Sequence, residues 1–255
     1  MRYMEPLVPF IMLYAAAMLL SIRIVSLRRL AIAVVLIFTG LYAVSFVNIY
    51  REPHPWISAS TWIYQNVESG AVIVSEMWDD RLPDKVSQSR ISGSAPHYPA
   101  AEVNWLSGTE ENDDLDKVRL NLTTLAEADY VALASNRNYG VIPRLPERYP
   151  LSSQFYPLLF DGHLGYEVAY VGTRVPNLFG FQLRPDSFRW PGLVVPEEVQ
   201  SYLEGEPGLN MGRFDESFTV YDQPLVIILK NVDNLSVDEM LNFFILPDSL
   251  IDQGE

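Results

Sequence analysis

The chain contains no cysteine and only three histidines, His54, His97 and His163, which lie far apart. The absence of cysteine excludes disulfides, thiolate zinc sites and cysteine nucleophiles. Because metal sites need several ligands in defined geometry, so few histidines argue against a histidine-rich site, and we predict no metal ion. A domain of about two hundred residues without disulfides must be stabilised by its own core, and a chain of this size buries enough surface for that.

Nucleotide and hydrolase motifs are also absent. The sequence has no GxGxxG, no phosphate-binding glycine-rich loop that ends in lysine, and no GxSxG. A membrane-tethered hydrolase is therefore a weak hypothesis, because no arrangement of nucleophile and base is visible. The sequence identifies no cofactor.

Basic residues are scarce. The chain has 18 basic and 32 acidic residues, and residues 1–50 hold one of the acids, Glu5, and four of the bases: Arg2, Arg23, Arg28 and Arg29. Residues 51–255 therefore carry 14 basic and 31 acidic residues, a formal net charge of −17. So acidic a domain repels phosphate backbones and anionic head groups, which argues against a nucleic-acid partner and against lying flat on an anionic membrane.

Two uncharged apolar segments, residues 6–22 and 30–50, predict a transmembrane helical hairpin within residues 1–50. The arginines of the short loop between them favour a cytoplasmic loop by the positive-inside rule. We therefore expect a multi-pass protein of the cell membrane whose domain, residues 51–255, is extracytoplasmic. A cleaved signal peptide is the alternative for the first segment, but no small-residue cleavage site precedes a polar mature start.

The outer domain reads as helix-then-strand units. An amphipathic helix over residues 58–67, after an extended exit from the membrane, leads into the β-branched run 71–76. A helix over 113–128 leads into a strand over 129–135. Further predicted elements are a helix over 152–160, a strand over 165–173, and a strand over 179–183 that either pairs with it or bends away at Gly180. An extended stretch over 217–221, a turn over 222–224, a strand over 225–231 and a closing helix over 236–245 follow. The fold class is α/β, a small three-layer domain with helices on both faces of the sheet.

Four side chains follow the first predicted strand: Glu76, Trp78, Asp79 and Asp80. The end of a strand is a common place for chemistry in α/β folds. The carboxylates are candidates for binding a divalent ion or the hydroxyls of a sugar or acceptor, with Trp78 stacking on the sugar. The alternative is a turn that the aspartates cap while Arg81 pairs with one of them.

An acid-rich segment comprises Glu110, Glu111, Asp113, Asp114 and Asp116. It lacks the glycine and the final glutamate of a calcium-binding loop. We therefore predict the solvated start of a helix, where acids are favourable.

Arg2 and Tyr3 lie at the outer membrane boundary in the predicted topology. There an arginine is able to hold a lipid phosphate by paired hydrogen bonds, which makes both residues candidates for contact with a donor phosphate. Ordinary interfacial anchoring by an aromatic residue and a cation is the alternative.

Several segments carry a family resemblance: RYMEPLVPF, HPWISASTWIYQNV, IVSEMWDDRLP, ADYVALASNRNYGVIPRLPERYPLSSQFYPLLFDGHLGYE and SFTVYDQPLVIILKN. In this order they resemble the C-terminal part of prokaryotic membrane glycosyltransferases of the dolichyl-phosphate-mannose protein mannosyltransferase-like type, which use polyprenyl-phosphate sugars as donors. The resemblance implies sugar transfer from a lipid-phosphate carrier to an extracytoplasmic acceptor. It also implies that the catalytic carboxylate lies in an upstream half of the enzyme, so this chain is not expected to catalyse alone. The alternative is a complete two-helix membrane protein whose outer domain binds carbohydrate or a partner protein.

Overall fold

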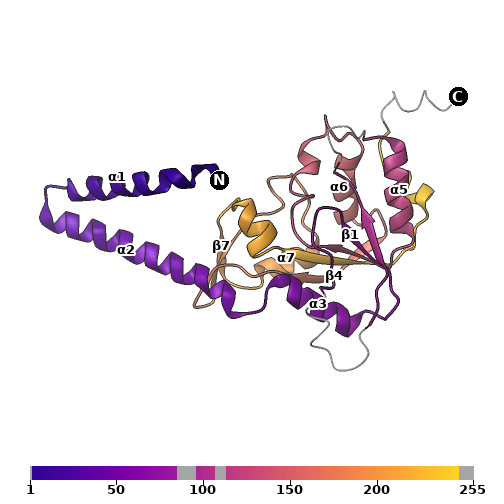
Figure 1. Ribbon diagram of the computed structural model, residues 1–255, viewed down its shortest axis with the longest axis horizontal. Helices are drawn as coiled ribbons and strands as arrows, with labels where there is room; N and C mark the ends of the chain where they lie inside the picture. Colours follow the sequence, from indigo (N-terminus) through magenta and orange to yellow (C-terminus); the bar gives the residue numbers. More distant parts are fainter. Residues whose placement is uncertain (1, 85–95, 107–112, 247–255) are drawn as a thin grey trace.

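The computed structural model describes residues 2–84, 96–106 and 113–246, with side chains from Glu5 onward. Two apolar helices extend from one end of a mixed α/β body (Figure 1). The second helix, α2 (Val25–Val47), has 23 residues and almost no buried side chains. At about 1.5 Å per residue it is roughly 35 Å long, enough to cross a hydrocarbon core of about 30 Å. The second predicted membrane segment is thus a helix with the length and composition of a span.

The first predicted segment is shorter than expected. It forms a 3-10 helix, η1 (Arg2–Leu7), which contains Pro6, followed by α1 (Val8–Leu20) of 13 residues. A regular helix of this length covers only about 20 Å, less than the hydrocarbon core. The prediction of two membrane-crossing helices is therefore corrected: among the described helices, α2 alone has the required length.

The body is built on a five-stranded mixed sheet in the order β2-β1-β3-β8-β4. Strand β1 pairs in parallel with β2 and with the central strand β3, whereas β8 is antiparallel to both β3 and β4. The strands are β1 (Ile73–Glu76), β2 (Ala100–Val103), β3 (Tyr130–Leu133), β4 (Tyr166–Gly172) and β8 (Val226–Asn231). The predicted strands 71–76, 129–135, 165–173 and 225–231 all belong to this sheet.

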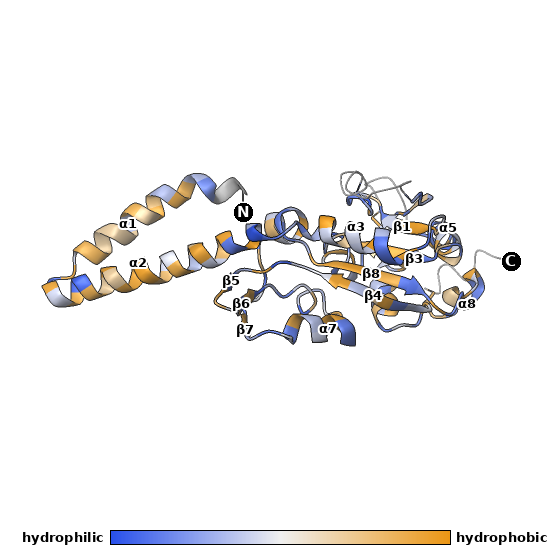
Figure 2. Cartoon of the chain, turned by 90° about the horizontal axis from the view of Figure 1, so that it is seen from below, coloured by the Kyte–Doolittle hydropathy of each residue, from blue (hydrophilic) through white to orange (hydrophobic). Residues whose placement is uncertain are grey.

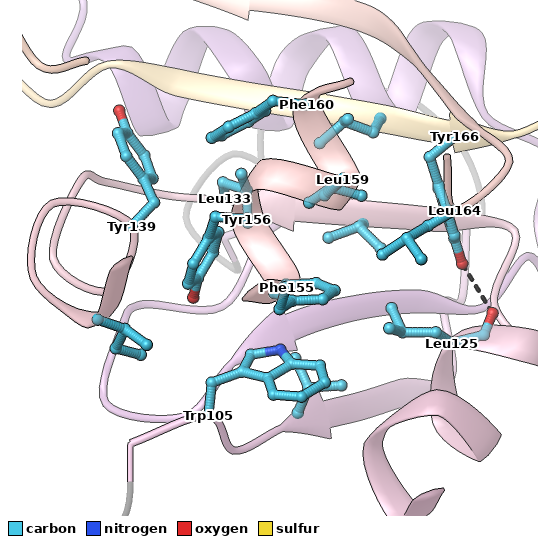
Figure 3. Packing of buried hydrophobic residues seen from close by; sticks show 14 of the residues in the cluster. Trp105, Leu125, Leu133, Tyr139, Phe155, Tyr156, Leu159, Phe160, Leu164 and Tyr166 are labelled. Atoms are coloured by element: carbon cyan, nitrogen blue, oxygen red, sulfur yellow. Dashed lines mark hydrogen bonds between the residues drawn. The ribbon is translucent and has the colours of Figure 1, made fainter. Parts of the chain in front are cut away.

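Helices cover both faces of the sheet, so the predicted mixed α/β class is confirmed (Figure 1). On one face α3 packs through Ala59 and Ile63 against Ile228. The opposite face carries a larger core, in which Trp105 stacks on Phe155 with ring centroids 4.1 Å apart (Figure 3). The helices are α3 (Pro55–Asn66), α5 (Leu115–Ala126), α6 (Phe155–Phe160) and α8 (Val237–Leu241), with 3-10 turns η2 (Asn48–Arg51), η3 (Ile142–Arg144) and η4 (Ser152–Gln154).

Two predicted elements differ in the structure. Helix α3 begins at Pro55 rather than within a serine-rich segment, because His54 Nδ1 accepts the Trp56 N–H (3.2 Å) and proline suits the first helical position. The predicted extended stretch 217–221 is a turn of π-helix, η5 (Ser217–Asp222). This turn places the ring of Phe218 5.3 Å from that of Phe46 in α2.

A second, small sheet lies beside the C-terminal end of α2 (Figure 2). It contains strands that pair in the order β5-β6-β7, namely β5 (Asn177–Leu178), β6 (Phe181–Arg184) and β7 (Gly208–Asn210). Helix α7 (Glu197–Glu204) precedes β7. The predicted strand 179–183 therefore bends away from the main sheet, at Gly180.

The end of α2 is bound to the body by segments that are distant in sequence. Asn48, the C-cap of α2, donates from Nδ2 to Asn177 O (2.7 Å). Tyr50 donates to the carboxylate of Asp222 at 2.8 and 2.9 Å. Together with the Phe46–Phe218 contact, these bonds fix the direction in which α2 leaves the body.

The acid-rich segment is less solvated than predicted. Glu110 and Glu111 lie outside the described residues. Asp114 caps α5 as expected for a helix start, accepting the Lys117 N–H at 3.0 Å. The side chain of Asp113, however, is only 2% exposed.

Asp113 connects α5 to the start of η4. Its Oδ2 accepts the backbone N–H groups of Leu151 and Ser152 at 2.8 and 2.9 Å, and its Oδ1 accepts the Ser152 hydroxyl. Lys117 Nζ lies 3.1 Å from Oδ1. A buried carboxylate with four donors stabilises the fold, because each donor would otherwise lack an acceptor.

We expect Asp113→Ala to lower the free energy of unfolding by about 3 kcal/mol, because it leaves the buried donors of Leu151 and Ser152 without their acceptor. Urea unfolding of the full chain in detergent micelles, followed by tryptophan fluorescence, measures this loss. Asp116→Ala, an exposed acid in the first turn of α5, is the matched control and should change stability by less than about 0.5 kcal/mol. Equal losses for the two variants would contradict the role assigned to Asp113.

Candidate functional site

The carboxyl ends of β1 and β3 meet at one edge of the main sheet, because the two strands run parallel. The loops that follow them are joined directly. Ser135 Oγ donates to Asp79 Oδ2 (2.6 Å), and Asn138 Nδ2 lies 3.4 Å from Met77 O. We call this polar end of the sheet the strand-end edge.

Glu76 ends β1 with its side chain inside the protein. The residue is 1% exposed, the Tyr156 hydroxyl donates to its Oε1, and its Oε2 has no hydrogen-bond partner within the described part of the chain. Burial raises the pKa of this carboxyl to about 8, an effect that the charge of Asp79 reinforces and the Tyr156 hydrogen bond opposes. Glu76 is therefore mostly protonated at neutral pH and out of reach of a sugar or an acceptor.

Asp79 lies nearer the surface but is occupied by the fold. Besides the Ser135 hydroxyl, it accepts the backbone N–H of Asp80 at Oδ1 (3.1 Å). Burial raises the pKa of Asp79, while these hydrogen bonds and the positive charge of Arg137 oppose the shift. Because the charge of Arg137 acts on Asp79, Asp79 lies on the side of the strand-end edge that is nearer to Arg137.

Trp78 and Asp80 face solvent. Trp78 is 67% exposed and adopts a left-handed backbone conformation with φ of 74°. Of the four predicted side chains, the structure thus brings Glu76 and Asp79 into the interior and leaves these two accessible. Arg81 does not pair with an aspartate: its Nε donates to Glu102 Oε1 at 2.7 Å.

The other predicted candidates, Arg2 and Tyr3, belong to η1 at the N-terminus. Their side chains lie outside the described residues. The predicted contact with a donor phosphate therefore stays a prediction.

The sequence reasoning missed the residues that follow β3. Ser135, Arg137 and Asn138 lie at the strand-end edge, and Tyr156 of α6 closes it over Glu76. A signal for the first three existed, since the ends of neighbouring parallel strands lie together and both strands were predicted. Nothing in the sequence marked Tyr156, which is distant along the chain.

A small hollow of about 50 Å³ opens next to this edge. Three segments form its walls: the loop after β3, residues 186–191 and residues 213–220. Its polar side chains include Asn136, Arg137, Asp186, Arg213 and Glu216. Asp186 is held by the fold, because it accepts backbone N–H groups and the amide of Asn210, and these bonds lower its pKa.

Two arginines of the lining, Arg137 and Arg213, contact aromatic rings in or beside the hollow. The guanidinium carbon of Arg137 lies 5.0 Å from the ring centroid of Tyr221, and its buried Nε has no hydrogen-bond partner among the described residues. Arg144 and Arg213 lie over the ring of Trp190 at 4.8 and 5.4 Å. Guanidinium groups with donors to spare suit a phosphate or carboxylate ligand.

The hollow adjoins the end of α2. His54 Nε2 donates to Tyr221 O at 3.0 Å, and the next residue, Asp222, accepts the hydroxyl of Tyr50. Tyr221 in turn stacks against Arg137. One short turn, η5, thus links the exit of α2 to the arginine of the hollow.

Among the described residues, no group of three or more His, Asp or Glu side chains is arranged to hold a metal ion. Comparison of the chain with protein-family models, curated proteins and solved structures gave no match. The family resemblance in the sequence therefore stays a hypothesis, and the site has to be judged by its own geometry.

The raised pKa of Glu76 predicts a pH dependence of stability. Between its ordinary value of 4.5 and about 8, the folded state keeps a proton that the unfolded state releases. Stability should therefore be highest below this window and fall as pH rises through it, with a slope of up to about 1.4 kcal/mol per pH unit. Urea unfolding at several pH values from 5 to 8 measures the slope.

Glu76→Gln removes this titration while keeping an acceptor for Tyr156, so the variant should show a flatter slope. Asp80→Asn, at an exposed neighbouring position, is the control and should keep the slope of the parent chain. If the glutamine variant and the parent chain lose stability in parallel, Glu76 does not titrate in this window.

Proposed function

We propose that this chain is a membrane-anchored, extracytoplasmic α/β domain of a glycosyltransferase that uses a polyprenyl-phosphate sugar as donor. In this proposal the domain binds the anionic part of the donor and supplies no catalytic base of its own. One observation carries the proposal: the arginine-bearing hollow lies beside the exit of α2, at the end of the domain nearest the membrane.

The position of Arg137 supports a lipid-linked ligand. The phosphate of such a donor lies at the head-group level, which is where α2 would leave the bilayer. The unpartnered Nε of Arg137 and the exposed guanidinium of Arg213 offer donors there. In a domain with a net charge of −17, and in a hollow that also holds Asp186 and Glu216, these two guanidinium groups would select an anionic ligand locally rather than by the overall field.

The strand-end carboxylates support a non-catalytic role. A general base must reach the proton that it removes, within hydrogen-bonding distance of the substrate. Glu76 is sealed beneath Tyr156, and Asp79 is engaged by Ser135 and a backbone N–H. The catalytic carboxylate is therefore expected on the membrane half of the enzyme that the family resemblance implies.

The charge distribution around α2 supports an outer location for the domain. Arg28 and Arg29 lie in the first turns of α2, at the end opposite the α/β body. By the positive-inside rule this end faces the cytoplasm, so the body faces outward.

A second candidate function is carbohydrate binding by a self-sufficient membrane protein. The observation that favours it is Trp78, which is largely exposed and held in a left-handed conformation beside the exposed Asp80. An exposed aromatic ring next to a carboxylate suits the stacking and hydrogen bonding of a sugar. Such binding would not need Arg137 or a phosphate.

We expect the full chain in nanodiscs to bind a short-chain polyprenyl-phosphate hexose, and Arg137→Gln to weaken this binding about tenfold or more, because a charged hydrogen bond is lost. Isothermal titration calorimetry measures the dissociation constants. Arg119→Gln is the matched control: Arg119 lies on α5 and makes only a surface ion pair with Asp238 among the described residues.

Free hexose oligosaccharides separate the two candidates. If the chain binds them as tightly as the phosphorylated lipid, and Trp78→Ala weakens binding while Arg137→Gln does not, the carbohydrate-binding function replaces the proposal.

Sugar transfer provides a further test. Membrane vesicles that contain only this chain, supplied with polyprenyl-phosphate hexoses and a mixed acceptor extract, should show no turnover. Turnover should appear when a membrane half of such an enzyme is co-expressed, and it should fall with Arg137→Gln. Turnover by the chain alone would contradict the assigned role and would direct attention to Asp79 and Asp80.

A further inference from the structure

The small sheet carries apolar side chains that the fold leaves uncovered. Phe179, in the turn between β5 and β6, is 96% exposed, and Phe181, Leu209 and Met211 are also exposed. We call these four residues the β5–β6 tip. Clustered exposed apolar residues of this kind mark an interaction surface, whereas single ones do not.

The turn itself is unusual for an exposed position. Leu178 pairs with Phe181 across two residues, Phe179 and Gly180, which have φ of 53° and 87°. A two-residue hairpin with positive φ at both positions normally carries asparagine or glycine at the first. A phenylalanine there is strained by its Cβ, and its exposed ring gains no packing inside the protein to offset that strain.

The charge of the small sheet differs from that of its surroundings. Residues 175–184 and 207–214 contain two basic residues, Arg184 and Arg213, and no acid, whereas residues 51–255 contain 31 acids. A surface that inserts among lipid head groups must lack carboxylates. Anionic head groups repel a carboxylate, and entry into the membrane removes its hydration.

The position of the tip identifies its partner. β5 packs along the last turn of α2, and Asn48 Nδ2 donates to Asn177 O at the start of β5. A helix of roughly 35 Å in a core of about 30 Å ends at the interface, so β5 lies at that level. Figure 2 shows the small sheet on the side of the body that faces the helices.

We propose that the β5–β6 tip inserts into the interfacial region of the same bilayer that α2 crosses, so that its partner is lipid. The proposal rests on the membrane-spanning part of the proposed function. With α2 and the tip both in the bilayer, the body has two attachment points, which hold the hollow of Arg137 at head-group level.

The absence of cysteine allows a direct test in the full chain. Single cysteines are placed at Phe179, at Val47, the exposed last residue of α2, at Leu36 within α2, and at Leu120, which is 70% exposed on α5. Each variant is labelled with bimane and placed in phosphatidylcholine nanodiscs that hold one copy. Nitroxide lipids with the spin label at the head group, shallow in the acyl chain or deep in it then report which positions contact lipid.

We expect the label of Phe179→Cys to be quenched by shallow nitroxides about as strongly as that of Val47→Cys, and several-fold more strongly than that of Leu120→Cys. Leu36→Cys should be quenched by deep nitroxides, which tests the membrane span separately. If Leu36→Cys is quenched as expected and Phe179→Cys behaves like Leu120→Cys, the span stands and the lipid contact of the tip is refuted. A blue shift at position 179 that needs a second copy of the chain would also refute it, in favour of a protein contact.

Discussion

The packing of the α/β body against the end of α2 determines how the rest of the molecule meets a membrane. Three segments far apart in sequence contact this helix end: Phe218 meets Phe46, Asn177 accepts a hydrogen bond from Asn48, and Asp222 accepts one from Tyr50. Each contact alone is modest, since exposed hydrogen bonds and single ring contacts contribute about 1 kcal/mol. Acting from different directions, they convert a flexible tether into a fixed junction.

This junction also explains why η5 departs from the extended conformation. A π-helical turn is rare and is found mostly at functional sites. Here three side chains of one turn make contacts in three directions. Phe218 contacts Phe46 of α2, Tyr221 contacts Arg137, and Asp222 accepts the hydrogen bond of Tyr50. A strand would alternate its side chains between two faces and could not make all three contacts.

The sequence predicted the elements whose cause is local. β1 and β8 are rich in β-branched residues, β3 is an apolar run that directly follows a helix, and α5 has an aspartate cap and an apolar face, so each could be recognised from a short window. β2 was missed because its sequence, AAEV, has a single β-branched residue and its stability comes from pairing with β1. The burial of Asp113 was missed for a similar reason, since its backbone donors lie 38 and 39 residues away.

The residues of the candidate site were even harder to predict from the sequence, because they too depend on contacts between distant segments. Glu76, Asp79 and Asp80 attract notice in the sequence because they are acidic and follow a strand, yet two of the three serve the interior. The hollow is formed by three segments that come together only in the folded chain, and none of them contains a motif. Its arginines could not be distinguished in sequence from the other arginines of the domain.

Burial of Glu76 links the fold to the chemistry that the domain is able to perform. A carboxyl with a pKa of about 8 adds no negative charge to the strand-end edge at neutral pH. An ionised Glu76 would add a second negative charge close to Asp79. That charge would weaken the positive field of Arg137 in the hollow. In the proposed function, the desolvation that keeps Glu76 neutral would therefore favour an anion at Arg137. In a domain with a net charge of −17, each further ionised carboxylate near Arg137 would repel such an anion.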